Sequence, residues 1–115
     1  MKRGDIYWAN LQPRSGSEQQ GRRPVIIISH NGFNQNPRWR SIIVIPASTS
    51  SAQARRGLTA VLLPQDIGGL NQESIALCHQ ITTLDRAKLT EKIGELSDDW
   101  MNKIEEGLKA ATDIT

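Results

Sequence analysis

Two neighbouring arginines, Arg22 and Arg23, follow a glycine-bracketed loop that runs from Gly16 to Gly21, and they lead into Pro24. The guanidinium group is planar, stays charged at working pH and donates two parallel hydrogen bonds, so it matches a phosphate group well. Pro24 disfavours the helical region for Arg23, so we expect an extended backbone where the next strand begins. The pair predicts phosphate binding at a strand entrance, and two ordinary surface arginines are the alternative that this pattern leaves open.

Hydroxyl groups make a second candidate site in the segment 46–51, which reads Pro-Ala-Ser-Thr-Ser-Ser. Ser48 and Thr49 follow an apolar run, and their side chains and backbone N–H groups together suit a phosphate oxygen. A polar linker has the same composition, so the pattern alone also permits a segment without a ligand.

Two side chains are candidates for proton transfer. His79 ends an apolar run and has an ordinary pKa suited to acid–base work near neutrality, although histidines in such places are more often structural. Glu18 is the only acid between Asp5 and Asp66, and it is placed to orient Arg23 or to accept a proton from a substrate hydroxyl. The two histidines lie far apart in the sequence and there is no carboxylate cluster, so we expect neither a metal nor a cofactor.

Trp39 stands between Arg38 and Arg40. An aromatic ring flanked by cations suits a stacked base beside its phosphates. A core residue at the edge of a barrel is the alternative.

Charge is distributed unevenly along the 115 residues, which fit one domain spanning 1–115. Residues 1–65 carry nine Lys/Arg and two Asp/Glu, a balance of +7, whereas residues 66–115 carry five and ten, a balance of −5. Most of the basic residues are arginines in three loop regions: Arg14, Arg22, Arg23, Arg38, Arg40, Arg55 and Arg56. If these loops converge, they form a surface for a polyanion or an acidic protein segment.

Location and redox chemistry are also constrained. No apolar run approaches the length of a membrane span, and the first residues lack the apolar core of a signal peptide, so we expect a cytoplasmic protein with no membrane contact. Cys78 is the sole cysteine and reads as a small buried hydrophobe rather than a nucleophile.

The apolar pattern predicts a mainly β fold with one C-terminal helix. We expect strands at 5–11, 24–29, 40–47, 58–63 and 74–81, with loops at 31–37 and 48–57. Ser97 is a plausible N-cap for a helix whose apolar residues recur at three and four positions. Five short strands and one helix predict a small, strongly bent β-barrel, which exposes enough apolar surface to favour a homodimer.

These segments together resemble the MazF/PemK family of toxin endoribonucleases. Residues 3–8, 16–25 and 45–49 carry the resemblance, and 80–85 and the closing helix also fit. The resemblance implies a homodimeric SH3-like barrel of the CcdB/PemK type. It implies metal-independent, sequence-specific cleavage of single-stranded RNA. In that reaction a ribose 2′-hydroxyl attacks the adjacent phosphate, leaving a 2′,3′-cyclic phosphate and a 5′-hydroxyl.

Carried over by position, the resemblance places the family's arginine at Arg23 and its threonine at Ser48, with Thr49 the close alternative. Arg23 would stabilise the transition-state charge and pass a proton to the leaving oxygen, and Ser48 would fix the phosphate. His79 stands where relatives often carry an acid, so the general base stays open: Glu18, His79 or neither. The remaining predicted RNA contacts are Ser17, Gln19, Arg22, Thr49, Arg55, Arg56 and Gln80.

The resemblance also implies a partner, a cognate antitoxin whose acidic, disordered C-terminal segment blocks the RNA groove. Two other functions remain as alternatives. One is a non-catalytic RNA-binding barrel. The other is a DNA gyrase poison on the same fold, which the ending Ala-Thr-Asp-Ile-Thr disfavours because such poisons end in an exposed Trp-Gly-Ile.

Overall fold

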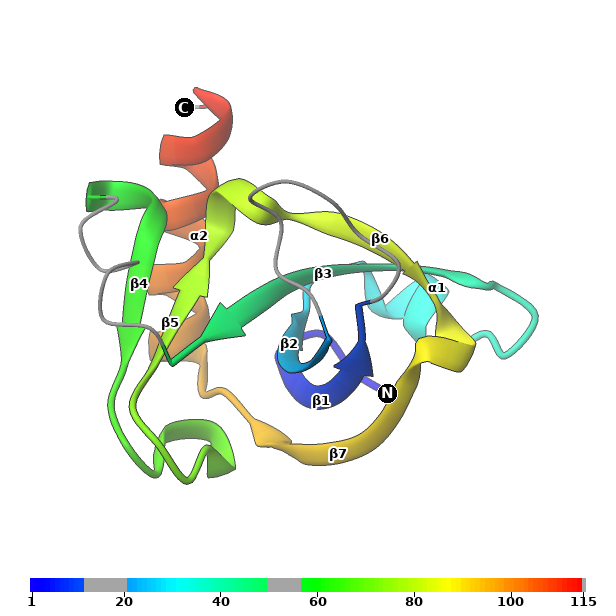
Figure 1. The fold of residues 1–115 in the computed structure, drawn as a ribbon. Coiled ribbons are helices and arrows are strands. Elements are labelled where there is room, and N and C mark those ends of the chain that lie inside the picture. The colour runs from blue at the N-terminus through cyan, green and yellow to red at the C-terminus, as the bar shows by residue number, and fades with distance from the viewer. Residues whose placement is uncertain (12–20, 50–56, 115) are drawn as a thin grey trace.

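The computed structural model describes residues 1–11, 21–49 and 57–114. In these residues seven strands form one antiparallel sheet, in the order β4-β5-β3-β2-β1-β7, with β6 paired to β3. The strands are β1 (Asp5–Asn10), β2 (Arg22–Ile27), β3 (Ser41–Ser48), β4 (Ala60–Leu63), β5 (Ser74–Leu77), β6 (Thr82–Asp85) and β7 (Leu89–Glu95). Figure 1 shows β3, β6 and β7 curling around β1 and β2. The predicted fold class is confirmed, with a sheet that curls like a barrel but stays open between β4 and β7 in the described residues.

The longest strand, β3, connects two halves of the sheet. Its first residues, Ser41–Val44, pair with β6, and its last two, Ala47 and Ser48, pair with β5. On its other side, Val44, Ile45 and Pro46 pair with β2. The two ends of β3 therefore lie in different surroundings, about 23 Å apart at the usual rise of a strand.

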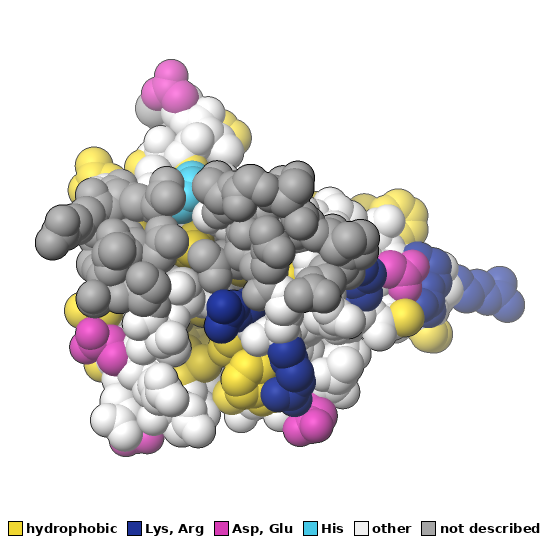
Figure 2. Space-filling model, in the orientation of Figure 1, with side chains coloured by type: hydrophobic (Ala, Val, Ile, Leu, Met, Phe, Trp, Pro, Cys, Tyr) yellow, Lys and Arg dark blue, Asp and Glu magenta, His cyan; other side chains and the backbone are white. Residues whose placement is uncertain are grey.

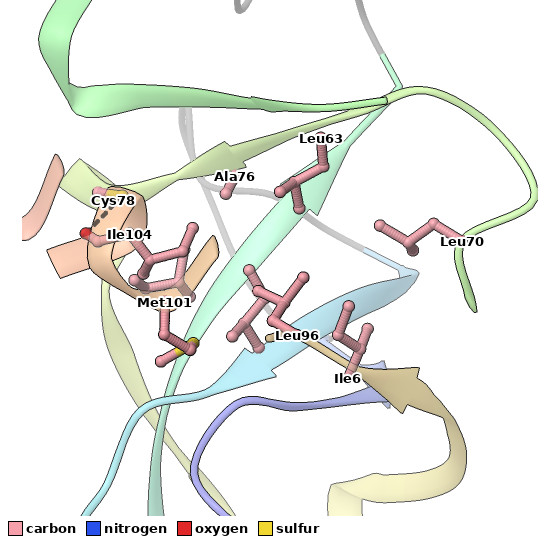
Figure 3. Packing of buried hydrophobic residues seen from close by; sticks show 10 residues of the cluster. Ile6, Leu63, Leu70, Ala76, Cys78, Leu96, Met101 and Ile104 are labelled. Carbon is pink, nitrogen blue, oxygen red and sulfur yellow. Dashed lines mark hydrogen bonds between the residues drawn. The ribbon is translucent and has the colours of Figure 1, made fainter. Parts of the chain in front are cut away.

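Residues of β2 and β3 are apolar on both faces because each face meets its own core. Ile26 and Ile45 belong to the cluster that packs against the helix α2 (Asp98–Thr112), together with Met101 and Ile104 (Figure 3). The residues that alternate with them face a second cluster, made of Ala9, Leu11, Val25, Ile27, Ile42, Val44 and Leu84. This confirms the prediction that the second strand is central.

Helix α2 begins at the predicted cap. The Ser97 side chain accepts a hydrogen bond from the Trp100 backbone N–H at 3.4 Å, and Asp98 and Asp99 occupy the first turn, where their charges complement the helix dipole. Met101 and Ile104 are buried, as the apolar periodicity predicted. Among the described residues no helix is both long and apolar enough to span a membrane.

Several local predictions were wrong. Strands β6 and β7 were not expected, because each carries few apolar residues and depends on pairing with β3 and β1 rather than on its own pattern. The run 74–81 is split into β5 and the 3-10 helix η3 (Cys78–Gln80), which carries His79. The first residues of the expected loop 31–37 form the short helix α1 (Asn31–Asn34), whose cap is the His30 side chain.

Strand ends also differ from the prediction. Arg22 and Arg23 are the first two residues of β2 rather than the end of a loop, and Ser48 is the last residue of β3. Strand β4 begins at Ala60, so Leu58 precedes it and is 84% exposed. Backbone pairing with neighbours extends β2 and β3 beyond their apolar residues, and no apolar pattern marks such an extension.

Cys78 is buried between β5 and α2, and its Sγ lies 3.7 Å from the Ile104 carbonyl oxygen (Figure 3). Burial raises the pKa of this thiol to about 11. The thiolate is therefore scarce near neutrality, which agrees with the predicted role as a small buried hydrophobe.

Gly107 lets α2 approach this cysteine closely. A Cβ added at Gly107 would lie 2.6 Å from Cys78 Sγ and 3.1 Å from Val61 Cγ2. Alanine favours a helix over glycine by about 1 kcal/mol, but overpacking a dense core costs about 1–3 kcal/mol. We expect Gly107→Ala to lower the free energy of unfolding by about 1 kcal/mol, measured by urea denaturation. Ala110→Gly, at an exposed position of the same helix, is the control for helix propensity alone. A more stable Gly107→Ala would show that this contact is loose.

Candidate active site

Arg22 and Arg23 are held at the start of β2, an interior strand, by pairing with β1, where Asn10 is opposite Arg22 and Ala9 is opposite Arg23. Both side chains are exposed. The Arg22 guanidinium carbon lies 4.2 Å from the centre of the Trp8 ring, and its Nη2 is 3.7 Å from Glu91 Oε1. No carboxylate among the described residues forms an ion pair with Arg23, so its fork is available to a ligand.

The end of β3 lies beside these arginines. Val25 pairs with Pro46 in the antiparallel register of β2 and β3. Beyond that pair, Ala47 and Thr49 line the same hollow as the two arginines, and Ser48 pairs with Ile75 of β5. Ser48 is buried, whereas the next residue, Thr49, is exposed.

A cavity of about 390 Å³ opens beside the start of β2. Its lining residues are Trp8, Arg22, Arg23, Pro24, Ala47, Thr49, Gly69, Leu70, Asn71, Gln72, Ser74, Lys92 and Ile93. Figure 2 shows basic side chains beside hydrophobic surface in the middle of this face. Among the described residues, the lining has three cations, hydroxyl and amide groups and an indole ring and no acid, so it suits an anion that carries a flat polar group.

Lys92 is anchored from behind the cavity. Its Nζ lies 3.5 Å from Asp5 Oδ1 and 3.5 Å from Glu95 Oε2. The buried Asp5 carboxylate raises the pKa of Lys92, so this cation stays charged across the working pH range.

The predicted site residues are only partly brought together. Arg22, Arg23 and Thr49 line the cavity, with Ser48 beside it. His79 and Gln80 do not line it. They follow β5 in η3, and His79 Nε2 lies 3.5 Å from Gln80 Nε2. Ser17, Glu18, Gln19, Arg55 and Arg56 lie outside the described residues.

The three arginine loops do not all converge. Arg38 and Arg40 precede β3, whereas Arg22 and Arg23 lie beside its last residues. Sequence reasoning also missed the lining residues Trp8, Asn71, Gln72, Ser74 and Lys92. Their positions depend on strand pairing and on the turn before β5, and the sequence signals neither.

Comparison with known proteins identifies the class to which this fold and site belong. Residues 2–112 match the family of PemK-like, MazF-like toxins of type II toxin–antitoxin systems, and the chain belongs to this family. It is 38% identical over 109 residues to the endoribonuclease EndoA of Bacillus subtilis (strain 168), covering 95% of this chain and 91% of the relative. The predicted enzyme class, a toxin endoribonuclease of the MazF/PemK type, is thereby confirmed.

Solved structures show the same fold at lower identity. The chain superposes on MazF from Deinococcus radiodurans with a TM-score of 0.80 at 23% identity, covering 99% of this chain and 97% of the other. An endoribonuclease from a mycobacterial species, solved with its cognate antitoxin, gives a TM-score of 0.79 at 23% identity, covering 100% and 97%.

Proposed function

We propose that this chain cleaves single-stranded RNA at a short recognition sequence, without a metal, by attack of a ribose 2′-hydroxyl on the adjacent phosphate. The observation that carries the proposal is the cavity beside the start of β2, where Arg23 and Thr49 face one space and the described lining residues include no acid; Ser48 directly precedes Thr49.

In this mechanism the 2′-oxygen forms a bond to phosphorus while the bond from phosphorus to the 5′-oxygen breaks. Negative charge grows on the phosphate oxygens, where the Arg23 guanidinium stabilises it, and Arg23 passes a proton to the leaving 5′-oxygen, which becomes the 5′-hydroxyl. A preorganised donor of this kind contributes several kcal/mol to the rate. Ser48 donates a second hydrogen bond to the phosphate, and Arg22, Lys92 and Thr49 hold the flanking strand.

The proton of the 2′-hydroxyl goes to a base, which is Glu18, His79 or neither of them, and His79 does not line the cavity. Their ordinary pKa values are about 4.3 and about 6.5. The acid limb of the rate against pH therefore separates them, in the wild type and in Glu18→Gln and His79→Asn.

The function is tested with a defined pool of single-stranded RNA incubated with the protein in EDTA. We expect cuts at a recurring short sequence with 2′,3′-cyclic phosphate and 5′-hydroxyl ends, read by end-specific enzymatic labelling. An intact pool that the protein nevertheless binds would favour the non-catalytic RNA-binding barrel instead.

The two hydroxyls at the end of β3 are expected to differ. Ser48→Ala should lower kcat by about 10²-fold, because it removes a donor to the transition-state charge. Thr49→Ala should mainly raise KM by about fivefold, the loss of one ordinary hydrogen bond of about 1 kcal/mol. Ser48→Thr keeps the hydroxyl and serves as the control. The reverse pattern in single-turnover kinetics would move the catalytic role to Thr49.

We also propose that the protein acts in the cytoplasm as a homodimer. Leu58, Leu62 and Ile114 are 84%, 48% and 64% exposed, and Leu58 and Ile114 line one hollow beside α2, which is apolar surface that a second copy would cover. Light scattering coupled to size exclusion tests this assembly.

The proposed regulator is a cognate antitoxin with an acidic, disordered C-terminal segment. The cations that line the cavity suit such a segment as well as they suit RNA. The antitoxin should therefore inhibit in competition with RNA.

A further inference from the structure

An exposed aromatic pair stands at the end of β3 opposite to the candidate active site. The rings of Phe33 and Trp39 stack with their centres 4.4 Å apart at an angle of 25°. They are 43% and 42% exposed, so the stacked pair presents one joint apolar surface to solvent.

Hydrogen bonds fix the orientation of the indole ring. Trp39 Nε1 donates to the Ser41 carbonyl oxygen at 2.7 Å, and the Trp39 carbonyl oxygen accepts from Arg86 Nε at 3.0 Å. One ring face lies on Phe33, so the exposed part of Trp39 is its outer face and rim. The ring is therefore preorganised to receive a flat partner.

The surroundings of the pair are cationic. Segment 30–41 contains Arg38 and Arg40 and no acid. Arg40 is paired with Asp85 at 2.8 Å, whereas Arg38 has no carboxylate partner in the described part of the chain. Figure 2 shows basic side chains projecting at the end of the molecule where α1 and the start of β3 lie.

We propose that the Phe33–Trp39 pair stacks an unpaired base of the RNA substrate and that Arg38 contacts a neighbouring phosphate; this surface deepens, and rests on, the proposed function. Every base presents a π-face, so such a contact adds affinity without reading sequence. A peptide partner fits less well. Ile28 and Ser29 donate to the Ile43 carbonyl oxygen on one side of β3, and β6 pairs on the other, so β3 offers no free edge for an added strand here.

The contact lies well away from the cleaved bond. The two ends of β3 are about 23 Å apart, so a short RNA held at Arg23 does not reach Trp39, whereas a longer one does. The Phe33–Trp39 pair should consequently change the affinity for long RNA and leave the chemical step unaltered.

The test uses single-stranded oligodeoxynucleotides of about 4 and about 16 nucleotides, within the range of site sizes of small barrels that bind single strands. These probes lack the 2′-hydroxyl, so binding is measured without cleavage, by fluorescence anisotropy. We expect Trp39→Ala to weaken binding of the long probe about tenfold, as the loss of one base stack implies, and to spare the short probe. Trp39→Phe should restore most of the affinity, and thermal unfolding checks that each variant is folded.

Arg38→Ala provides a second variant that removes an exposed side chain without touching packing. It should lower the slope of log affinity against log salt concentration by about one for the long probe, because one phosphate contact is lost. Lys103→Ala, which removes an exposed cation from α2, is the matched control and should change nothing. Equal effects on both probes, or no effect of Trp39→Ala, would overturn the proposal.

Two further outcomes distinguish this RNA contact from a protein-binding surface and from the proposed cleavage activity. If Trp39→Ala loses binding to an acidic peptide but still binds the long probe like the wild type, the pair belongs to a protein partner and the RNA contact is refuted. If wild-type protein cuts no RNA yet binds the long probe through Trp39, the proposed cleavage fails while the stacking contact stands.

Discussion

Replacing Arg23 with alanine is expected to lower kcat for RNA cleavage by about 10²–10³-fold, the usual loss when one preorganised donor to a transition-state charge is removed. Arg23 is exposed at the start of β2 and lines the cavity, and no described carboxylate neutralises it. Its backbone is paired with β1, so the side chain starts from a fixed point. Single-turnover cleavage of a defined RNA in EDTA measures the loss directly.

The neighbouring arginine is the matched control. Arg22 lies over Trp8 and beside Glu91, and it is placed to hold the flanking strand. Arg22→Ala removes the same charge one residue away and should raise KM with little change in kcat. Arg23→Lys keeps the charge but loses the planar fork, so it should recover only part of the rate. Equal kcat losses in Arg22→Ala and Arg23→Ala would mean that the cavity needs net charge rather than one positioned guanidinium.

The parts of the fold that could be predicted are those where one local rule decides the outcome. The apolar run 25–28 fills both faces of a central strand, and the structure places it between two cores. Ser97 followed by two acids specifies a helix start, and the cap is present. The arginines before Pro24 line the cavity, and the extended backbone that Pro24 imposes on Arg23 follows from local sterics alone.

The rest depends on partners that are distant in sequence. Strand β7 has an exposed, mostly polar surface, and its pairing with β1 is interrupted by register shifts that no periodicity encodes. Gly94 permits the segment at Gly68 to approach, because a Cβ at Gly94 would lie 2.1 Å from the Gly68 carbonyl oxygen. The cavity combines side chains from β1, β2, β7 and the turn before β5. Sequence patterns within single segments do not show which of these segments lie together in the folded protein.

Removing the Arg86 side chain is expected to cause the largest loss of stability among single changes outside the core. Its guanidinium donates to four backbone carbonyl oxygens at 2.9–3.0 Å, those of Phe33, Asn34, Asn36 and Trp39. Helix α1 has only four residues, so its last carbonyls have no partners within the helix. Arg86 supplies partners from a segment about fifty residues away, and the carbonyl oxygens of Phe33 and Asn36 also accept from the backbone N–H groups of Asn36 and Trp39.

A hydrogen bond to a charged group contributes about 1.5–3 kcal/mol when its loss leaves a group without a partner. Water reaches the carbonyls of the exposed residues Phe33, Asn36 and Trp39, while Asn34 is buried. We therefore expect Arg86→Ala to lower the free energy of unfolding by about 2–3 kcal/mol, well below the sum of four such bonds. Urea denaturation measures the loss, and Arg86→Lys should restore only part of it, because one ammonium cannot serve four carbonyls arranged around a planar fork.

Arg40 is the comparison that isolates this effect, because it lies in the same region but pairs with an exposed carboxylate. Its hydrogen bond to Asp85 lowers the pKa of that carboxyl, yet exposed ion pairs contribute little to folding. Arg40→Ala should leave stability nearly unchanged.

The two variants together show what holds the segment. If Arg40→Ala destabilises the protein as much as Arg86→Ala does, the segment depends on positive charge rather than on the bridged carbonyls. If neither change matters, the remaining contacts of the segment hold it, among them the bonds from Asn34 Nδ2 to the Ser29 carbonyl oxygen and from Trp39 Nε1 to the Ser41 carbonyl oxygen, and Arg86→Ala should leave long-probe binding intact. If only Arg86→Ala matters, the fixed orientation of Trp39 depends on this arginine, and that variant should lose long-probe affinity without losing cleavage of short RNA.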